Sequence, residues 1–279
     1  MTSTTCHNPS RLYPIFTHRS STHPVQNVGH ADMVQGPDGR WAATYLGARP
    51  RGSTPGFHVL GRETFIAGID WVDGWPVFNE GRFAVPVPDT AFVDDFARDV
   101  LDSRWVVPDG EPESAVVRHP SGGLSFRIAS DQESGLLCTR VRDFAWRAEA
   151  IVDGAGELRL RLDDRHWCGI VVGDGSAHVV VQIGDIRQSL GTVPVPDGPV
   201  GLRLEATSPN TAPVPFGYAG PDDIVLSVEI GEGPIELARL DGRYFSTEVA
   251  AGFTGRMLAL GSPRAGGRVL SLSYRPLPT

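Results

Sequence analysis

Short apolar runs, rather than long periodic ones, make up the hydrophobic pattern of this chain. Many of them alternate apolar with polar residues, as in "LRLRLDD" at 158–164 and "LSVEI" at 226–230. Alternation of this kind is the period of a strand with one buried face. Turn sequences such as "PDGR" and "VGDG" separate the runs. The pattern therefore predicts an all-β protein.

Strand-like segments recur along almost the whole chain. We expect strands at 41–47, 64–71, 115–119, 124–129, 136–153, 157–164, 168–173, 177–184, 200–207, 223–231, 235–240, 257–261 and 269–276. No segment keeps helical periodicity over three turns, and the segment 94–105 comes closest to a short helix.

A domain boundary is expected in "FAVPVPDTAFVDDF", where Pro86 and Pro88 interrupt strand pairing. We therefore predict one domain at 1–88 and a second at 89–279. Five of the eight histidines fall within the first 58 residues, so any chemistry is expected in the first domain. Four to six strands without a partner layer are marginally stable, so this domain resembles a part of something larger.

Composition narrows the classes of function. The chain has 33 acidic and 25 basic residues and no basic run, so we expect no nucleic-acid or membrane partner. Its three cysteines are widely spaced and form no CxxC motif, which favours reduced structural thiols over a disulfide framework or a zinc site. With neither a leader-like N-terminus nor a membrane-spanning apolar run, a cytoplasmic location is the default expectation.

Several motifs occur in a recognisable order. "NVGHADMVQGPDGRWAATYLGARP" and "FHVLGRETFIAGIDWVDGWPV" resemble the last propeller blade of glycoside hydrolase family 43, in its β-xylosidase and α-arabinofuranosidase branch. "HNPSRLYPIFTHRS" is similar to the segment leading into that blade. "FVDDFARDVLDSRW", "LRLRLDDRHWCGIVVG" and "LDGRYFSTEVAAGFTGRMLALG" resemble the sandwich domain that follows it. The resemblance implies a fragment of a five-bladed β-propeller followed by a concanavalin-A-like, jelly-roll β-sandwich.

The same resemblance implies an inverting hydrolase of xylosides and arabinosides, which needs a carboxylic acid and a carboxylate base. In the family these lie on earlier blades. None of the carboxylates before the predicted boundary matches them: Asp32, Asp38, Glu63, Asp70, Asp73, Glu80 and Asp89. We expect no catalytic residue and no activity from this chain alone. The alternative is a non-catalytic carbohydrate-binding or interaction module.

Four residues are candidates for contact with a xylo- or arabino-oligosaccharide or an ion. The resemblance assigns Arg62 to a sugar hydroxyl; a salt bridge with Glu63 or another strand neighbour is the structural alternative. Arg49 is a weaker candidate for the same wall of the sugar-binding cavity. Phe253 matches an aromatic that closes the sugar pocket, although it could equally be a core phenylalanine.

His30 matches a family residue that helps hold calcium or water in the central cavity. It could bind a metal only if the full propeller cavity existed, and calcium takes six to eight oxygen ligands. We therefore expect no cofactor. An uncapped blade edge predicts self-association or pairing with a missing propeller half.

Two further clusters invite a functional interpretation. Trp41, Trp71 and Trp75 could form a sugar platform, but blade aromatics more often pack between sheets. "DDRHW" at 163–167 resembles an active site in composition, yet neighbouring charges on a strand point to opposite faces. A solvated hairpin is the favoured interpretation.

Overall fold

The computed structural model describes residues 14–53, 55–127, 135–209, 219–231, 233–264 and 266–278. It confirms the all-β prediction, because the helices of the described part are single turns: α1 (Pro112–Ala115), η1 (Gly242–Phe245) and α2 (Thr247–Ala250). The chain divides into two compact units. Unit 1 comprises Met1–Pro50 and Gly61–Asp89, and unit 2 comprises Arg51–Leu60 and Thr90–Thr279.

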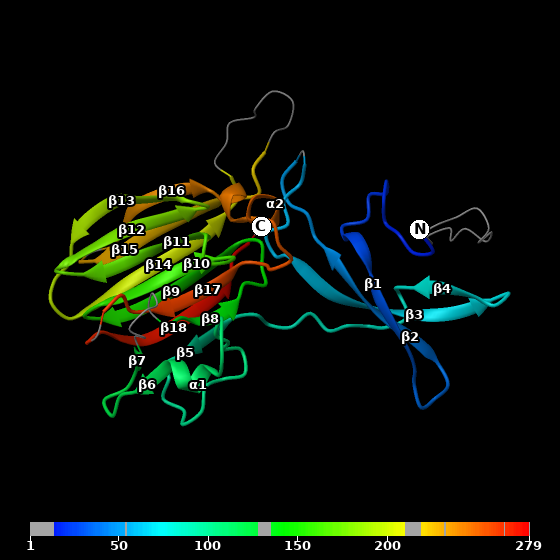
Figure 1. The fold of residues 1–279 in the computed structure, drawn as a ribbon, viewed down its shortest axis with the longest axis horizontal. Coiled ribbons are helices and arrows are strands. Elements are labelled where there is room, and N and C mark those ends of the chain that lie inside the picture. The colour runs from blue at the N-terminus through cyan, green and yellow to red at the C-terminus, as the bar shows by residue number, and fades with distance from the viewer. Residues whose placement is uncertain are drawn as a thin grey trace. The chain divides into compact units, whose positions relative to one another are not determined.

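Unit 1 contains one antiparallel meander of four strands in sequence order (Figure 1). Its strands are β1 (Gln26–Gln35), β2 (Trp41–Ala48), β3 (Arg62–Val72) and β4 (Trp75–Asn79). This up-and-down order is that of one propeller blade. The predicted strands at 41–47 and 64–71 correspond to β2 and β3, while β1 and β4 were not predicted.

Aromatic rings pack over one face of this small sheet. Phe16 stacks on Phe78 with ring centroids 4.4 Å apart and meets Tyr45 edge-on at 4.9 Å. Tyr45 is buried, and Phe65 stacks beside it at 5.7 Å. Large rings bury much apolar area, so they contribute to the core of unit 1 together with buried aliphatic residues such as Val25 and Ile69.

Unit 2 is a sandwich of two antiparallel sheets, stacked face to face in Figure 1. One sheet has the order β13-β12-β11-β10-β17-β8. Its strands are β13 (Ile186–Pro194), β12 (Ser176–Ile183), β11 (His166–Gly173), β10 (Gly156–Arg161), β17 (Met257–Gly261) and β8 (Leu137–Arg140).

The second sheet has the order β16-β15-β14-β9-β18-β7-β6, and β5 also pairs with β18. Its strands are β16 (Gly233–Asp241), β15 (Asp223–Ile230), β14 (Pro199–Thr207), β9 (Trp146–Asp153), β18 (Arg268–Pro276), β7 (Leu124–Phe126), β6 (Val116–Arg118) and β5 (Phe92–Asp94).

The core of unit 2 follows directly from the alternation in the sequence. Every second residue of β9 and β14 is buried, and Leu202 and Leu204 are fully inaccessible. They belong to one apolar cluster with Leu158, Leu160 and Ile170 of the opposite sheet. Alternate residues share a face, so the polar residues between the leucines of β10 lie on the outer face of its sheet.

The segment 51–60 is part of unit 2, an exchange that the sequence did not indicate. Phe57, Val59 and Leu60 are buried in the sandwich core. The Arg256 backbone N–H donates to the Val59 carbonyl at 3.1 Å, and Arg140 Nη2 donates to the Leu60 carbonyl at 2.5 Å. The chain therefore leaves unit 1 after β2, docks on the sandwich and returns to form β3.

The short helix considered at 94–105 is absent, because side chains there compete for the backbone. Asp94 accepts the Phe96 amide at 2.8 Å and the Trp105 indole N–H at 2.7 Å, which holds an irregular turn. Phe96 has a left-handed φ of 58°. Strand β13 was also missed, since most of its residues are exposed on both faces and it shows no clear alternation.

Candidate functional site

The predicted wall residues Arg49 and Arg62 lie beside each other on unit 1. Arg62 begins β3 and pairs in register with Ala48 at the end of β2, directly before Arg49. Arg49 donates to both carboxylate oxygens of Glu63, from Nε at 2.7 Å and from Nη2 at 2.9 Å. The Arg49 guanidinium is thus paired with the Glu63 carboxylate. Arg62 is half-buried beside this pair.

His30 lies where β1 departs from regular pairing. The register against β2 shifts between Gln26 and Gly29 and again between Gly29 and Asp32. His30 has φ of 55° and Asn27 has φ of 54°, both left-handed. Left-handed φ values are uncommon for non-glycine residues, although Asn and His adopt them more readily than most others. The exposed His30 side chain is therefore placed by a bulge rather than by regular strand geometry.

Phe253 lies on unit 2, after α2. That helix is capped at its C-terminus by Ala251, which has a left-handed φ of 57°. The Phe253 side chain is 76% exposed, so it is not the core phenylalanine of the structural alternative.

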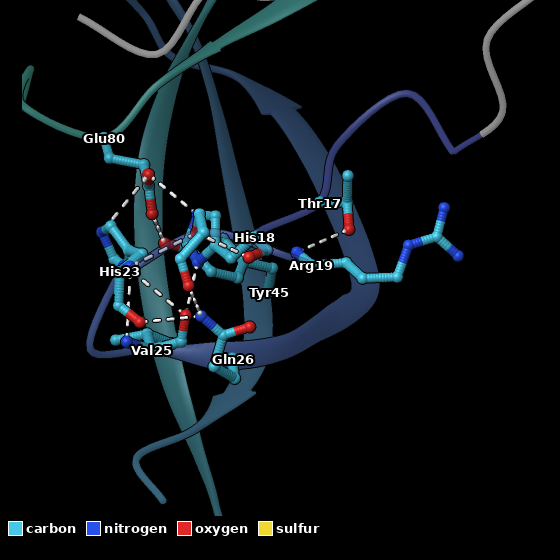
Figure 2. A network of polar contacts seen from close by, with 9 residues as sticks. Thr17, His18, Arg19, His23, Val25, Gln26, Tyr45 and Glu80 are labelled. Carbon is cyan, nitrogen blue, oxygen red and sulfur yellow. Dashed lines mark hydrogen bonds and ion pairs between the residues drawn. The ribbon is translucent and has the colours of Figure 1, made fainter. Parts of the chain in front are cut away.

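Unit 1 also contains a polar cluster that we did not predict (Figure 2). His18 precedes β1 and is buried; its Nδ1 donates to the Val25 carbonyl at 2.7 Å, and its Nε2 lies 3.0 Å from Glu80 Oε2. His23 Nε2 lies 3.9 Å from the same oxygen. The Tyr45 hydroxyl donates to Glu80 Oε1. The only sequence signal was two histidines five residues apart.

The Tyr45 phenol is fixed in its protonated form. Burial raises its pKa, and the hydrogen bond to the Glu80 carboxylate raises it further, so the pKa lies well above the usual range. Tyr45 therefore acts as a hydrogen-bond donor throughout the accessible pH range and orients one oxygen of Glu80.

A second polar site lies on the outer face of the six-stranded sheet of unit 2. Arg159 pairs in register with Gly169, and a Cβ there would lie 2.8 Å from Arg159 Cγ. The missing side chain lets the Arg159 guanidinium lie 4.0 Å from the Trp167 ring centroid. Arg159 Nε donates to Glu157 at 2.9 Å, and these side chains are only 8% and 1% exposed.

These residues line a depression of about 270 Å³. His178 from β12 and Arg187 from β13 complete its wall, and Arg187 lies 5.5 Å from the Trp167 ring centroid. A buried ion pair costs desolvation that apolar residues would avoid. Because the pair of Arg159 and Glu157 is costly for stability and lies on the outer face of its sheet, it is a candidate site for binding a ligand. The alternating charges of β10 were visible in the sequence, but Gly169 gave no hint of its partner.

Four of the seven carboxylates of unit 1 are held by structural partners. Besides Glu63 and Glu80, Asp38 pairs with Arg40 at 2.6 Å and Asp70 with Arg82 at 2.5 Å. The Arg40 amide and side chain lower the pKa of Asp38, and the Arg82 hydrogen bond lowers that of Asp70. A general acid needs a raised pKa, so neither aspartate suits that role.

The clusters that raised alternative interpretations are resolved by their placement. The "DDRHW" segment lies at the connection between β10 and β11, where His166 Nδ1 contacts Asp163 at 2.9 Å; the hairpin interpretation is confirmed. Trp71 and Trp75 are 47% and 45% exposed rather than enclosed, and Trp71 meets Trp41 edge-on.

Two of the three cysteines fall within the described part. Cys138 and Cys168 are free and buried, and burial raises the pKa of both thiols. They are structural thiols, as expected, while Cys6 lies outside the described residues. Within the described ranges, no helix is long and apolar enough to cross a membrane.

Fold and site together define the class: a propeller-type four-stranded sheet joined to a concanavalin-A-like sandwich. Residues 2–76 match the family model described as glycosyl hydrolases family 43. A xylosidase/arabinosidase of Butyrivibrio fibrisolvens is 40% identical over 109 residues, covering 33% of this chain and 20% of that protein. The non-reducing end alpha-L-arabinofuranosidase BoGH43B of Bacteroides ovatus is 36% identical over 204 residues, covering 63% and 38%.

A solved structure, xylan beta-1,4-xylosidase from Bacillus halodurans, superposes with a TM-score of 0.73 at 19% identity, over 96% of this chain and 57% of that one. At that identity the likeness concerns the fold. These matches relate the chain to glycoside hydrolase family 43, in its xylosidase and arabinofuranosidase branch. The chain spans less than two thirds of each of these relatives.

Proposed function

We propose that this chain forms the C-terminal portion of a family 43 glycoside hydrolase, in which unit 1 supplies part of the wall that holds a xylose or arabinose unit. The carrying observation is that the matched segment, residues 2–76, contains both Arg62 and the strained, exposed His30 on one sheet. Guanidinium donors suit pairs of sugar oxygens. The names of the relatives support xylosides and arabinofuranosides as the substrate class.

We further propose that the acid and base of the reaction are not among the residues of this chain. Four carboxylates of unit 1 have arginine, histidine or tyrosine partners: Asp38, Glu63, Asp70 and Glu80. Asp73 occupies a turn with φ of 50°, and Asp32 is exposed on β1. An inverting pair also needs a gap of about 6.5–9.5 Å that admits one water.

Two measurements test this proposal together. The full chain is incubated with aryl β-xyloside and aryl α-arabinofuranoside, and we expect no turnover above the blank; clear turnover would show that a catalytic pair is present. Contact with xylo-oligosaccharides is followed by saturation-transfer NMR. We expect Arg62→Ala to weaken the signal, and Arg98→Ala, a surface arginine 81% exposed, to leave it unchanged. The wall assignment fails if both variants behave like the parent.

The depression on unit 2 favours a second candidate function, binding of an acidic sugar chain without hydrolysis. Three arginines and a histidine line it against two carboxylates: Arg159, Arg187, Arg264 and His178 against Glu157 and Asp174. Arginine recognises carboxylates in a bidentate manner. Xylo-oligosaccharides with and without uronic acid substituents separate this candidate from the first one.

For this test we expect Arg187→Ala to reduce affinity for the substituted sugar by about tenfold or more, in line with about 1.5–3 kcal/mol for a charge-assisted hydrogen bond. Arg165→Ala is the matched control, because Arg165 is exposed and pairs with Asp185 outside the depression. Equal affinity for both sugars would exclude a carboxylate-specific site.

A further inference from the structure

One backbone carbonyl orients both histidines of the cluster in unit 1 (Figure 2). The Val25 carbonyl oxygen lies 2.7 Å from His18 Nδ1 and 3.1 Å from His23 Nδ1. A carbonyl can only accept, and it has two lone pairs. The His18 contact therefore places a proton on Nδ1 of His18, and His23 takes the same tautomer when its Nδ1 donates to this carbonyl rather than accepting from the Val25 amide at 3.1 Å. In the neutral ring this leaves a lone pair on Nε2.

Both Nε2 atoms then face the same carboxylate oxygen. Glu80 Oε2 lies 3.0 Å from His18 Nε2 and 3.9 Å from His23 Nε2. Lone pairs and a carboxylate at these distances repel one another unless a positive charge lies among them. His18 and His23 also stack with ring centroids 3.9 Å apart, so two imidazolium rings would repel in turn.

The Glu80 carboxylate and the loop that carries the two histidines are also held in place by hydrogen bonds. Tyr45 occupies Glu80 Oε1, which leaves Oε2 for the histidines. The Ser21 hydroxyl donates to the His18 carbonyl at 2.6 Å, and Gln26 Nε2 donates to the His23 carbonyl at 2.8 Å, so the loop between the two histidines is fixed. Outer hydrogen bonds of this kind typically orient the ligands of a metal ion.

We propose that His18, His23 and Glu80 form a binding site for a divalent transition-metal ion of the zinc class. The three ligand atoms lie within 4.8 Å of one another, and tetrahedral zinc with bonds of about 2.0–2.1 Å needs ligands about 3.3 Å apart. Two imidazoles and one carboxylate suit zinc better than calcium or magnesium, which take oxygen ligands. The His23 side chain is 38% exposed, so solvent and ions reach the cluster.

In the alternative arrangement no metal is bound, and the histidine Nε2 atoms carry hydrogens. His23 Nδ1 also lies 3.1 Å from the Val25 amide, and if it accepts that bond the Nε2 atom carries the hydrogen. His18 would then be an imidazolium paired with Glu80. The two arrangements differ in the protonation of Nε2, which nitrogen NMR reads directly.

The experiment uses the full chain, stripped with a chelator and titrated with Zn²⁺ in a calorimeter and with Co²⁺ in an absorption spectrometer. We expect one ion per chain and visible Co²⁺ bands of tetrahedral type. His23→Gln and Glu80→Gln should each weaken Zn²⁺ binding at least tenfold. Mg²⁺ should give no binding heat.

Two control variants separate this site from adventitious binding. His119→Gln removes an exposed histidine of unit 2, and a Cys6→Ser/His7→Gln double variant removes other metal-binding side chains near the N-terminus. Both should bind Zn²⁺ like the parent, and circular dichroism establishes that every variant is folded. The proposal is overturned if stoichiometric binding is absent, if it follows the Cys6 and His7 variant, or if His18 Nε2 carries a proton at pH 7 in the presence of Zn²⁺.

Discussion

The buried ion pair of unit 2 between Asp222 and Arg256 offers a sharp test of what holds the sandwich together. Arg256 Nη1 donates to Asp222 Oδ2 at 2.5 Å and Nη2 donates to Oδ1 at 2.9 Å, with exposures of 1% and 0%. Arg256 also donates to the carbonyls of Phe245 and Gly242, each at 2.8 Å. The guanidinium thus ties together η1 and the segment before β15.

The perturbation is Asp222→Asn, which keeps the shape and removes the charge. Breaking a buried pair costs about 3–5 kcal/mol because it leaves an uncompensated charge. Asparagine retains one acceptor oxygen, so we expect the lower end, about 3 kcal/mol. For a unit of roughly 200 residues, each kcal/mol lowers the unfolding temperature by about 2–4 °C. The expected decrease is therefore about 6–12 °C.

Thermal unfolding is followed by tryptophan fluorescence, since Trp146 is fully buried in the apolar core of unit 2 and reports its packing. Asp185→Asn is the control, because its partner Arg165 and Asp185 itself are mostly exposed; exposed pairs contribute little. A decrease below about 2 °C for Asp222→Asn would refute the argument that this pair is desolvated and needed. The double variant Asp222→Asn/Arg256→Met should recover part of the loss.

Three further outcomes are expected. Burial raises the pKa of Glu248, but the His58 amide and side chain outweigh this and lower it overall; its stabilising contribution is therefore present above its unfolded pKa of about 4.3 and lost as pH falls through the folded value. Glu248→Gln should accordingly flatten the acid limb of the plot of unfolding temperature against pH. Gly255→Ala places a Cβ 2.1 Å from the Leu60 carbonyl oxygen, and we expect about 1–3 kcal/mol of destabilisation and faster proteolysis within 51–60. Phe253→Ala should change stability by less than about 0.5 kcal/mol, because the ring is exposed, while reducing contact with sugar in the NMR assay.

The strand pattern could be predicted because it depends on local alternation. Segments such as 200–207 and 223–231 carry the period of a half-buried strand, and the structure places β14 and β15 there. Strand β13 was not predicted because most of its residues are exposed, so its sequence does not alternate between apolar and polar residues. The short helix considered at 94–105 does not form for a different reason: the Asp94 carboxylate accepts a hydrogen bond from the indole N–H of Trp105, eleven residues away.

The polar sites could not be predicted because they join residues that are distant in sequence. His18 and Glu80 are separated by 62 positions, and no sequence motif links them. The Arg159 guanidinium reaches the Trp167 ring because Gly169, which lies opposite Arg159 on β11, has no side chain, and this relation depends on the register of β10 against β11. Arg62 and His30, by contrast, were proposed from the resemblance of their motifs to those of a known family, and their contact with a sugar or an ion stays a prediction.

The excursion of residues 51–60 has a consequence for any attempt to divide or recombine this molecule. A fragment beginning at residue 90 would lack Phe57, Val59 and Leu60 from its apolar core and would expose the surface that they cover. A fragment ending at residue 89 would carry those apolar residues with nothing to bury them. In a chimera with a homologue, residues 51–60 must therefore come from the same protein as the sandwich, and not from the protein that supplies β2 and β3.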